Sequence, residues 1–257
     1  MKKSRFPTVY LIIITVLTWI PVFVGILYSF NGNRSSGHWT GFSLKWYGVL
    51  LRDRSMREAF LNSVILGVSS SLLGAALSVT AALAFRRRLL KSAGLTKIAL
   101  MLPIMVPDII LGMGFLAFFR VLHLPFGMLT LIIAHTTFSV PYIFSQVQAR
   151  LASMNTSEID ASRVLGAGPI RTFFEVTLPY LLPAVFSGMV LSFAMSFDDV
   201  IISIFVTGVN VNTLPIKVYT QVKNGVTPEI NALCTVMLFI AVSGYLISNQ
   251  IKRRSSK

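Results

Sequence analysis

The chain has 257 residues, of which 54% are hydrophobic and only 12% are charged, and its mean hydropathy is +0.73. This composition excludes a soluble globular protein and is typical of a chain embedded in a lipid bilayer. The formal net charge of +14 would also suit a nucleic-acid-binding protein. The basic residues, however, lie between apolar segments rather than in a stripe, so we expect no nucleic-acid partner.

Six apolar runs are long enough to cross a bilayer as helices. In chain order they are residues 9–30, 60–85, 98–119, 128–149, 182–206 and 230–248. The sequence therefore predicts an all-α polytopic membrane protein with six transmembrane helices, in a single domain over residues 1–257. The first run is too long for the core of a signal peptide, so we expect it to remain as an anchor.

The lysines and arginines predict the orientation of these helices. Fifteen of the 23 fall at the N-terminus, in the loops after the second and fourth runs, and in the C-terminal tail. The other eight fall on the opposite side. Cytoplasmic loops carry the basic excess in membrane proteins, so we expect a multi-pass protein of the cell membrane with both termini in the cytosol. The basic residues would contact anionic lipid head groups there.

Three aspartates lie inside the predicted spans. Asp108 falls near the middle of the third run, and Asp198 and Asp199 fall in the outer half of the fifth. An ionised carboxylate in a membrane helix costs at least roughly 2.5–3.5 kcal/mol and should face a cavity or a partner. The runs contain no lysine or arginine, so we expect no resident counterion. Protonated carboxyls, a cation from another subunit and a transported cation all remain open.

A polar stripe runs along the fifth predicted span. Gly188, Ser192, Ser196, Asp199 and Ser203 follow one another at helical spacing, which places them on one face. Serines in membrane helices also serve as packing contacts between helices. Because Asp199 belongs to the stripe, we expect this face to line a translocation pathway.

Aromatic residues could assist the recognition of a cation. Phe197, Tyr219 and Trp46 are candidates for cation–π contact, although each could equally pack or anchor at the membrane interface. Charge alone would allow a polyamine, a metal ion, a thiamine-like cation or protons as the cargo. The three histidines have no metal-ligand spacing, so we expect no metal site.

The polar segment 155–179 between the fourth and fifth runs predicts a helix–turn–helix. Thr156 or Ser157 is suited to cap the first helix, and Gly166 to end it in the left-handed conformation. Pro169 is suited to begin a second short helix that ends at Leu178-Pro179. The pattern by itself fits an ordinary loop as well as a docking element.

Two sets of motifs resemble ABC-importer permeases. The first resembles their cytoplasmic EAA loop, with Asp in place of the usual Glu and Ser in place of the second Ala. It consists of Asp160-Ala161-Ser162, Leu165-Gly166-Ala167 and Leu178-Pro179. The second set is more specific and resembles permeases of spermidine/putrescine importers. It consists of Trp46-Tyr47, Pro107-Asp108-Ile109, Ser196-Phe197-Asp198-Asp199-Val200, Phe205-Val206-Thr207-Gly208, Leu214-Pro215, Tyr219 and residues 225–233.

The resemblance implies the MetI-like fold of type I importers and a non-catalytic subunit without cofactor. It implies four partners besides membrane lipid: a second homologous permease, an ATPase dimer, an extracytoplasmic polyamine-binding protein and the polyamine itself. Substrate-pathway residues would be Asp108, Ser196, Asp198, Asp199, Trp46, Phe197 and Tyr219. ATPase coupling would involve Asp160, Ala161, Ser162, Leu165, Gly166, Ala167 and Gly168. The alternatives are a permease for another cationic solute and a self-sufficient secondary transporter or channel that carries protons on Asp108 or Asp199.

Overall fold

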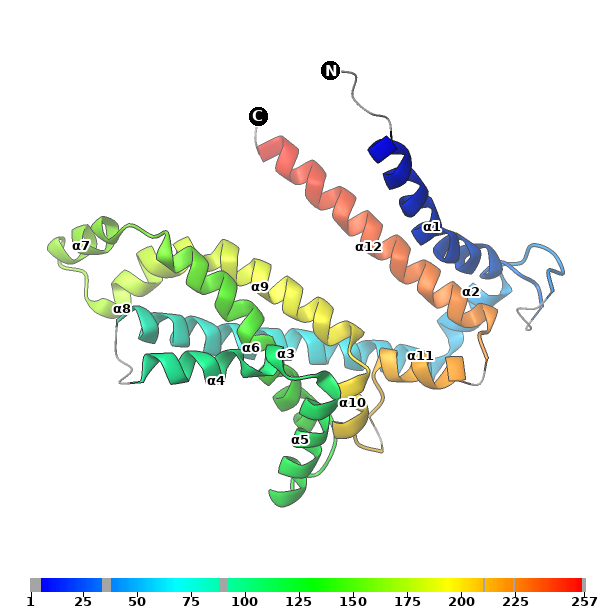
Figure 1. The fold of residues 1–257 in the computed structure, drawn as a ribbon, viewed down its shortest axis with the longest axis horizontal. Helices are drawn as coiled ribbons and strands as arrows, with labels where there is room; N and C mark the ends of the chain where they lie inside the picture. The colour runs from blue at the N-terminus through cyan, green and yellow to red at the C-terminus, as the bar shows by residue number, and fades with distance from the viewer. Residues whose placement is uncertain (1–5, 34–37, 88–91, 210, 224, 256–257) are drawn as a thin grey trace. The chain divides into compact units, whose positions relative to one another are not determined.

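The computed structural model describes residues 6–33, 38–87, 92–209, 211–223 and 225–255. The described chain is built from helices (Figure 1), and its one strand-like pairing is an isolated bridge between Asn31 and Phe42. The predicted all-α class is therefore confirmed. The helices are α1 (Phe6–Tyr28), α2 (Lys45–Arg52), α3 (Arg54–Arg86), α4 (Ala93–Met105), α5 (Asp108–Val121), α6 (Met128–Ala152), α7 (Thr156–Val164), α8 (Pro169–Thr172), the π-helical turn η1 (Phe173–Thr177), α9 (Leu178–Asp198), α10 (Ile201–Val206), α11 (Leu214–Lys223) and α12 (Pro228–Ser255).

Four helices in the described residues are long and apolar enough to cross a membrane. They are Thr8–Tyr28, Arg54–Arg86, Met128–Ala152 and Pro169–Asp198. The pair α4 and α5 meets the same criterion only when taken together, and the two helices are bent by 110°. The apolar part of α12, Pro228–Ser243, is shorter than these four helices. The six predicted runs thus correspond to four long helices, one broken pair and one shorter apolar helix.

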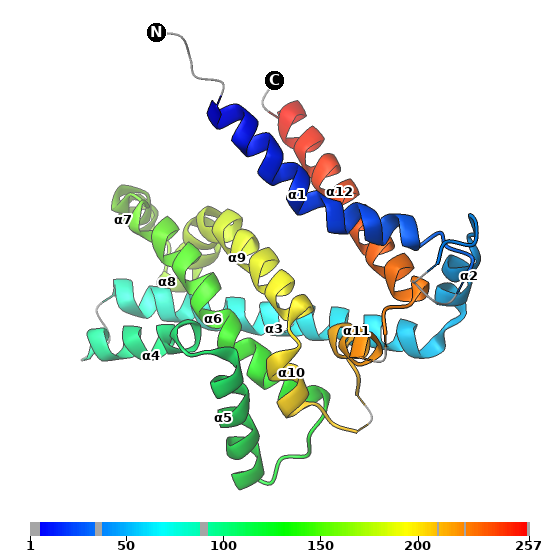
Figure 2. The ribbon, with the colours of Figure 1, turned by 45° about the vertical axis from the view of Figure 1, so that its right-hand side comes forward.

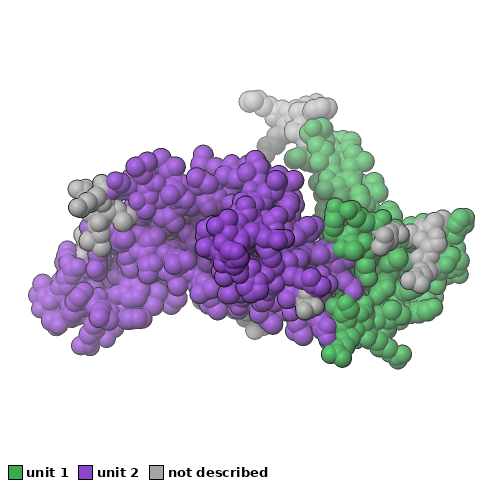
Figure 3. Space-filling view, turned by 90° about the horizontal axis from the view of Figure 1, so that it is seen from below, with its two compact units in different colours: residues 1–57, 218–257 green, residues 58–217 purple. Residues whose placement is uncertain are grey.

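The chain divides into two compact units (Figure 3). Unit 1 comprises residues 1–57 and 218–257, and in it α12 packs against α1 and α2. Trp46 anchors α2, because its indole Nε1 donates to the backbone oxygen of Asn31 at 2.7 Å and only 6% of the residue is exposed. The apolar side chains of α1 from Val9 to Leu27 are largely exposed, as expected for a helix that meets lipid or another membrane subunit.

Unit 2, residues 58–217, is organised around α6. This helix packs most extensively on α9, and the two lie side by side in Figures 1 and 2. Gly188 permits the close approach, because a Cβ there would lie 2.9 Å from the Cα of Ile143 on α6. α6 also contacts α4, α5 and α10. One apolar cluster joins α6 to α3 and α9 around Phe144 and Leu181, and a second joins it to α5 and α10 around Phe119 and Leu131.

Candidate functional site

Three aspartates from two distant parts of the sequence line one pocket in unit 2. Asp108 begins α5, Asp198 ends α9, and Asp199 lies in the connection between α9 and α10. The pocket has a volume of about 300 Å³, and we call it the acidic pocket. Its other lining residues are Pro103, Phe138, Tyr142, Met195, Val200, Ile201 and Ile202. The three acids, each predicted to face a cavity or a partner, thus line the same cavity.

The first of two helix interruptions at this pocket separates α4 from α5. The prediction of one continuous third span over residues 98–119 is therefore wrong. Pro107 lacks a backbone N–H and disfavours a helical conformation of the residue before it, so Val106 is extended, with φ −91° and ψ 132°. The carbonyl of Pro107 then accepts the N–H groups of Ile110 and Leu111 at 2.9 and 3.0 Å, which starts α5 in a new direction with Asp108 at its first position.

The second interruption lies between α9 and α10, so the prediction of a continuous fifth span over 182–206 is also wrong. Asp199 leaves the helix with ψ 124°. Its carboxylate accepts the backbone N–H groups of Ile202 at 3.2 Å and Ser203 at 2.8 Å, and the hydroxyl of Ser203 at 2.7 Å. These bonds satisfy free N–H groups at the start of α10 as an N-cap does. Asp199, which was expected to lie within one continuous helix, therefore stabilises the start of a new one.

His135 on α6 completes this arrangement. It is fully buried, and its Nδ1 lies 2.7 Å from the Ser196 hydroxyl on α9. Its Nε2 lies 3.0 Å from the Ser203 hydroxyl and 3.4 Å from Oδ2 of Asp199. One ring therefore joins α6, α9 and α10. The expectation of no resident counterion concerned lysine and arginine, and it left out the histidine that lies 3.4 Å from Asp199.

The polar stripe on α9 faces α6. Gly188, Ser192 and Ser196 are buried in this helix pair, and none of them lines the acidic pocket. Asp199, by contrast, lines the acidic pocket, so the stripe is divided between the helix pair and the pocket. These small residues allow the backbones of α6 and α9 to approach each other, and the Ser196 hydroxyl is hydrogen-bonded to His135.

Asp108 and Asp198 differ from Asp199 in that both are exposed. Among the described residues neither has a hydrogen-bonding or ion-pair partner for its side chain. The acidic pocket therefore contains one carboxylate held by the protein and two that are available to a ligand.

The aromatic walls of the pocket are not the aromatics that the sequence suggested. Phe138 and Tyr142 on α6 line it. Phe197 instead packs edge-to-face on Phe60 at 6.0 Å and stacks on Phe193 at 5.6 Å. The other two candidates, Trp46 and Tyr219, belong to unit 1, where Trp46 is a buried anchor and Tyr219 is exposed, with Nζ of Lys223 5.2 Å from its ring centre.

The predicted helix–turn–helix is present as α7 and α8, which we call the α7–α8 element (residues 156–172). Asn155, not Thr156 or Ser157, caps α7, because its side chain accepts the N–H of Ser157 at 3.1 Å. Gly166 has φ +85°, which confirms the predicted left-handed turn. The Ala167 N–H then donates to the Ser162 carbonyl at 3.0 Å, which closes the helix end. Pro169 begins α8, also as predicted.

The second short helix does not end at Leu178-Pro179. Instead α8 continues through η1 into α9, and the helix runs without a break over Pro169–Asp198. Pro179 would place its ring against the Glu175 carbonyl in a regular α-helix. In the π-helical turn the Leu178 N–H bonds to the Phe173 carbonyl five residues earlier, which accommodates the proline. The prediction of a helix end here is therefore wrong.

Comparison with known proteins identifies relatives over nearly the whole chain. The family model described as "Binding-protein-dependent transport system inner membrane component" matches residues 74–256. The spermidine/putrescine transport system permease protein PotC of Haemophilus influenzae is 32% identical over 256 residues, which cover 100% of both chains. PotC of Escherichia coli (strain K12) is 34% identical and covers 93% of this chain and 90% of the relative. The putrescine transport system permease protein PotI of Escherichia coli (strain K12) is 34% identical over 98% of this chain and 94% of the relative.

Solved structures support the same fold. A chain from a bacterial ABC transporter involved in the import of the acidic polysaccharide alginate matches with a TM-score of 0.74 at 14% identity, over 97% of this chain and 98% of that chain. A chain from the inward-facing MetNI methionine ABC transporter matches with a TM-score of 0.58 at 20% identity, over 84% of this chain and 100% of that chain. At these identities the likeness concerns the fold alone.

Proposed function

The chain belongs to the family of binding-protein-dependent transport system inner membrane components, and we propose that it forms one half of the pathway of an ATP-driven polyamine importer. The names of its relatives, which refer to spermidine and putrescine transport, support the choice of substrate. The permease would lie in the cell membrane with six crossings and both termini in the cytosol. ATP hydrolysis would belong to a separate subunit.

The acidic pocket is the observation that carries this proposal. Polyamines are flexible apolar chains with several ammonium groups, and the free carboxylates of Asp108 and Asp198 offer separate positions for two of them. Phe138 and Tyr142 add aromatic faces that attract cations. A pocket of about 300 Å³ is at the lower end of the range for small-molecule sites, as suits half of a pathway that a second permease completes.

The remaining pathway candidates would act less directly. Asp199 would keep the break between α9 and α10 open while it adds negative charge to the pocket. Ser196 would support it through His135. Phe197 would hold the end of α9 by packing, and Trp46 and Tyr219 are pathway candidates on the resemblance alone.

The α7–α8 element would couple the pathway to the ATPase dimer. Val164 and Leu165 are 88% and 87% exposed, and Ile170 is exposed as well, so the element presents apolar side chains in a segment that is otherwise polar. Such a patch is typical of a protein interface. The continuous helix from Pro169 to Asp198 would transmit a movement of the element to the acidic pocket. An extracytoplasmic polyamine-binding protein would load the outer side.

The test is transport by the co-purified complex in proteoliposomes. We expect the vesicles to take up labelled spermidine and putrescine. This uptake should require ATP in the vesicle lumen, which corresponds to the cytosol, and the loaded binding protein outside the vesicle. Uptake of either polyamine by this chain alone under an ion gradient, without nucleotide, would instead establish the secondary-transporter alternative. ATP-dependent uptake of a different cation, with no uptake of polyamines, would show that the importer carries another cationic solute.

A further inference from the structure

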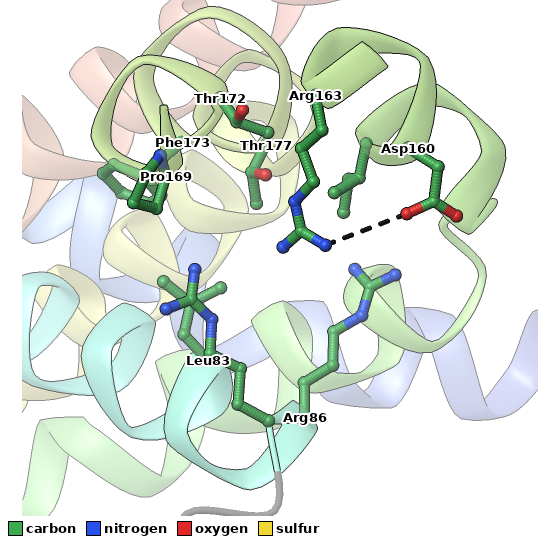
Figure 4. A pocket seen from close by; sticks show the side chains of 10 residues that line it. Leu83, Arg86, Asp160, Arg163, Pro169, Thr172, Phe173 and Thr177 are labelled. Atoms are coloured by element: carbon green, nitrogen blue, oxygen red, sulfur yellow. Dashed lines mark ion pairs between the residues drawn. The ribbon is translucent and has the colours of Figure 1, made fainter. Parts of the chain in front are cut away.

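A second pocket in unit 2 contains three arginines and lies beside the α7–α8 element. It has a volume of about 200 Å³ and is formed by the end of α3, by α7 and by the beginning of the long helix that starts at Pro169. We call it the arginine pocket. Figure 4 shows the side chains of Arg86 and Arg163 extending into the same space from opposite walls. Its lining residues are Leu83, Arg86, Arg87, Ile159, Asp160, Arg163, Pro169, Thr172, Phe173 and Thr177.

The positive charge of this pocket is poorly compensated. Asp160 is the one acid that lines it, and its carboxylate lies 3.8 Å from Arg163, with both side chains more than half exposed; such surface pairs contribute little. Arg86 has the thioether sulfur of Met154 as its partner at 3.3 Å, which is a weak acceptor. In the described part of the chain the Arg87 side chain has no hydrogen-bonding or ion-pair partner.

Two arginines outside the pocket differ from those that line it. Arg171 donates to the Glu175 carboxylate at 2.8 Å. Arg150 lies 4.1 Å from the centre of the Tyr180 ring and donates to the Tyr180 carbonyl at 3.2 Å. Arg150 and Arg171 therefore have partners within the chain, whereas the arginines of the pocket converge without enough negative charge.

Three guanidinium groups around a small space repel one another unless an anion lies among them. Guanidinium groups match the oxygen atoms of a phosphate group in fork geometry. The apolar walls formed by Leu83, Ile159 and Phe173 would reduce the exposure of those contacts to water. The pocket also belongs to the side of the protein where the basic residues collect, which we expect to face the anionic cytoplasmic leaflet.

We propose that the arginine pocket binds a phosphate group, which either a phospholipid head group or inorganic phosphate can supply. Bound there, the anion joins the end of α3 to the α7–α8 element, since Arg86 and Arg87 come from one and Arg163 from the other. The position of the element then depends on the anion. This site is separate from the acidic pocket and does not require that polyamines are the cargo.

The test uses the full chain in its assembled complex, purified in a neutral detergent. Native mass spectrometry measures the binding of phosphatidylglycerol and of phosphatidylcholine with the same acyl chains, and calorimetry measures the binding of inorganic phosphate. We expect the double variant Arg86→Gln/Arg163→Gln to lose affinity for the phosphate-bearing anion by at least about tenfold, as for the loss of one charge-assisted hydrogen bond. Arg150→Gln/Arg171→Gln, which removes the same two positive charges outside the pocket, is the matched control and should bind as the wild type.

Each outcome decides between sources or ends the proposal. Arginine-dependent preference for phosphatidylglycerol over phosphatidylcholine identifies a lipid head group. Arginine-dependent binding of inorganic phosphate without that preference identifies free phosphate. Equal losses in the control Arg150→Gln/Arg171→Gln and in Arg86→Gln/Arg163→Gln would show general charge attraction and overturn the site, as would no loss in either. Arg86→Lys/Arg163→Lys keeps the charge without the fork geometry, so intermediate binding in a folded complex supports specific recognition.

Discussion

The acidic pocket and the α7–α8 element differ in what each leaves without a partner. In the pocket the unpaired groups are polar, the carboxylates of Asp108 and Asp198. In the element they are apolar, chiefly Val164 and Leu165. Unpaired carboxylates in a membrane protein call for a cation, and exposed apolar side chains call for a protein surface. Under the proposed function, the contrast separates the region that would bind the polyamine from the region that would bind the ATPase.

The largest effect on transport is expected at the turn between α7 and α8. We predict that Gly166→Val reduces uptake by at least about tenfold, because a β-branched residue in the left-handed region costs roughly 1–2 kcal/mol or more. Membrane insertion and polyamine binding in the acidic pocket should be retained. Uptake in proteoliposomes, with ATP hydrolysis measured in the same sample, checks this.

Two further variants make the result of Gly166→Val interpretable. Gly94→Val introduces the same side chain where the backbone is ordinary and the space is open, and it should transport normally. Gly166→Asn should recover much of the activity, because asparagine tolerates the left-handed conformation. Normal transport by Gly166→Val would remove the coupling role from the element.

In the acidic pocket, Asp108→Asn and Asp198→Asn should each raise the apparent KM for spermidine about tenfold, the loss expected for one charge-assisted hydrogen bond. The thermal stability of the purified complex should stay unchanged, because neither carboxylate has a partner to lose among the described residues. Asp53→Asn is the control outside the pocket; its side chain caps Met56, and asparagine can do the same. An unchanged KM in both pocket variants would exclude them as ligand contacts.

Asp199 should behave differently from its neighbour. Asp199→Asn and His135→Ala both leave buried polar groups without partners, which costs about 1–3 kcal/mol, so both should lower thermal stability as well as transport. The two losses should not add in the double variant, because both residues belong to one network. Additive losses would contradict the proposal that Asp199 and His135 together hold the connection between α9 and α10. Normal stability and normal transport of Asp199→Asn would contradict it as well.

The smallest effect is expected at the start of α7. Asn155→Ala removes the cap and should cost about 1 kcal/mol of helix stability, with a modest decrease in coupling efficiency. Ser157→Ala should have no effect, because Ser157 contributes its backbone N–H to the cap and not its hydroxyl. Hydrogen exchange of the α7 amides measures both variants, and the reverse order of effects would restore Ser157 as the cap.

The sequence predicted the helices well because long apolar runs have few alternatives in a bilayer. It did not predict where two of the helices are interrupted, because a proline in the sequence does not show whether a helix breaks there. Pro21, Pro141 and Pro183 all lie inside continuous helices, whereas Pro107 ends one. In a membrane protein, neighbouring helices decide whether the freed backbone groups are satisfied, and that information is tertiary.

The candidate site shows the same division. The cost of burying a charge was enough to select Asp108, Asp198 and Asp199 and to predict that each faces a cavity or a partner. It could not show that Asp199 already has partners, because His135 lies on another helix, far away in the sequence. A signal was present, since a histidine inside a predicted span is itself an unusual ionisable group. His135 could therefore have been predicted as a partner for one of the three aspartates.

The most direct test of the account is ATP-dependent spermidine uptake by the complex that carries Asp108→Asn/Asp198→Asn. If the cargo supplies the charge that balances these two carboxylates, uptake should fall about a hundredfold, as for two lost charge-assisted hydrogen bonds. Assembly and basal ATP hydrolysis should remain. Uptake at the wild-type rate by a complex that lacks both charges would contradict the account.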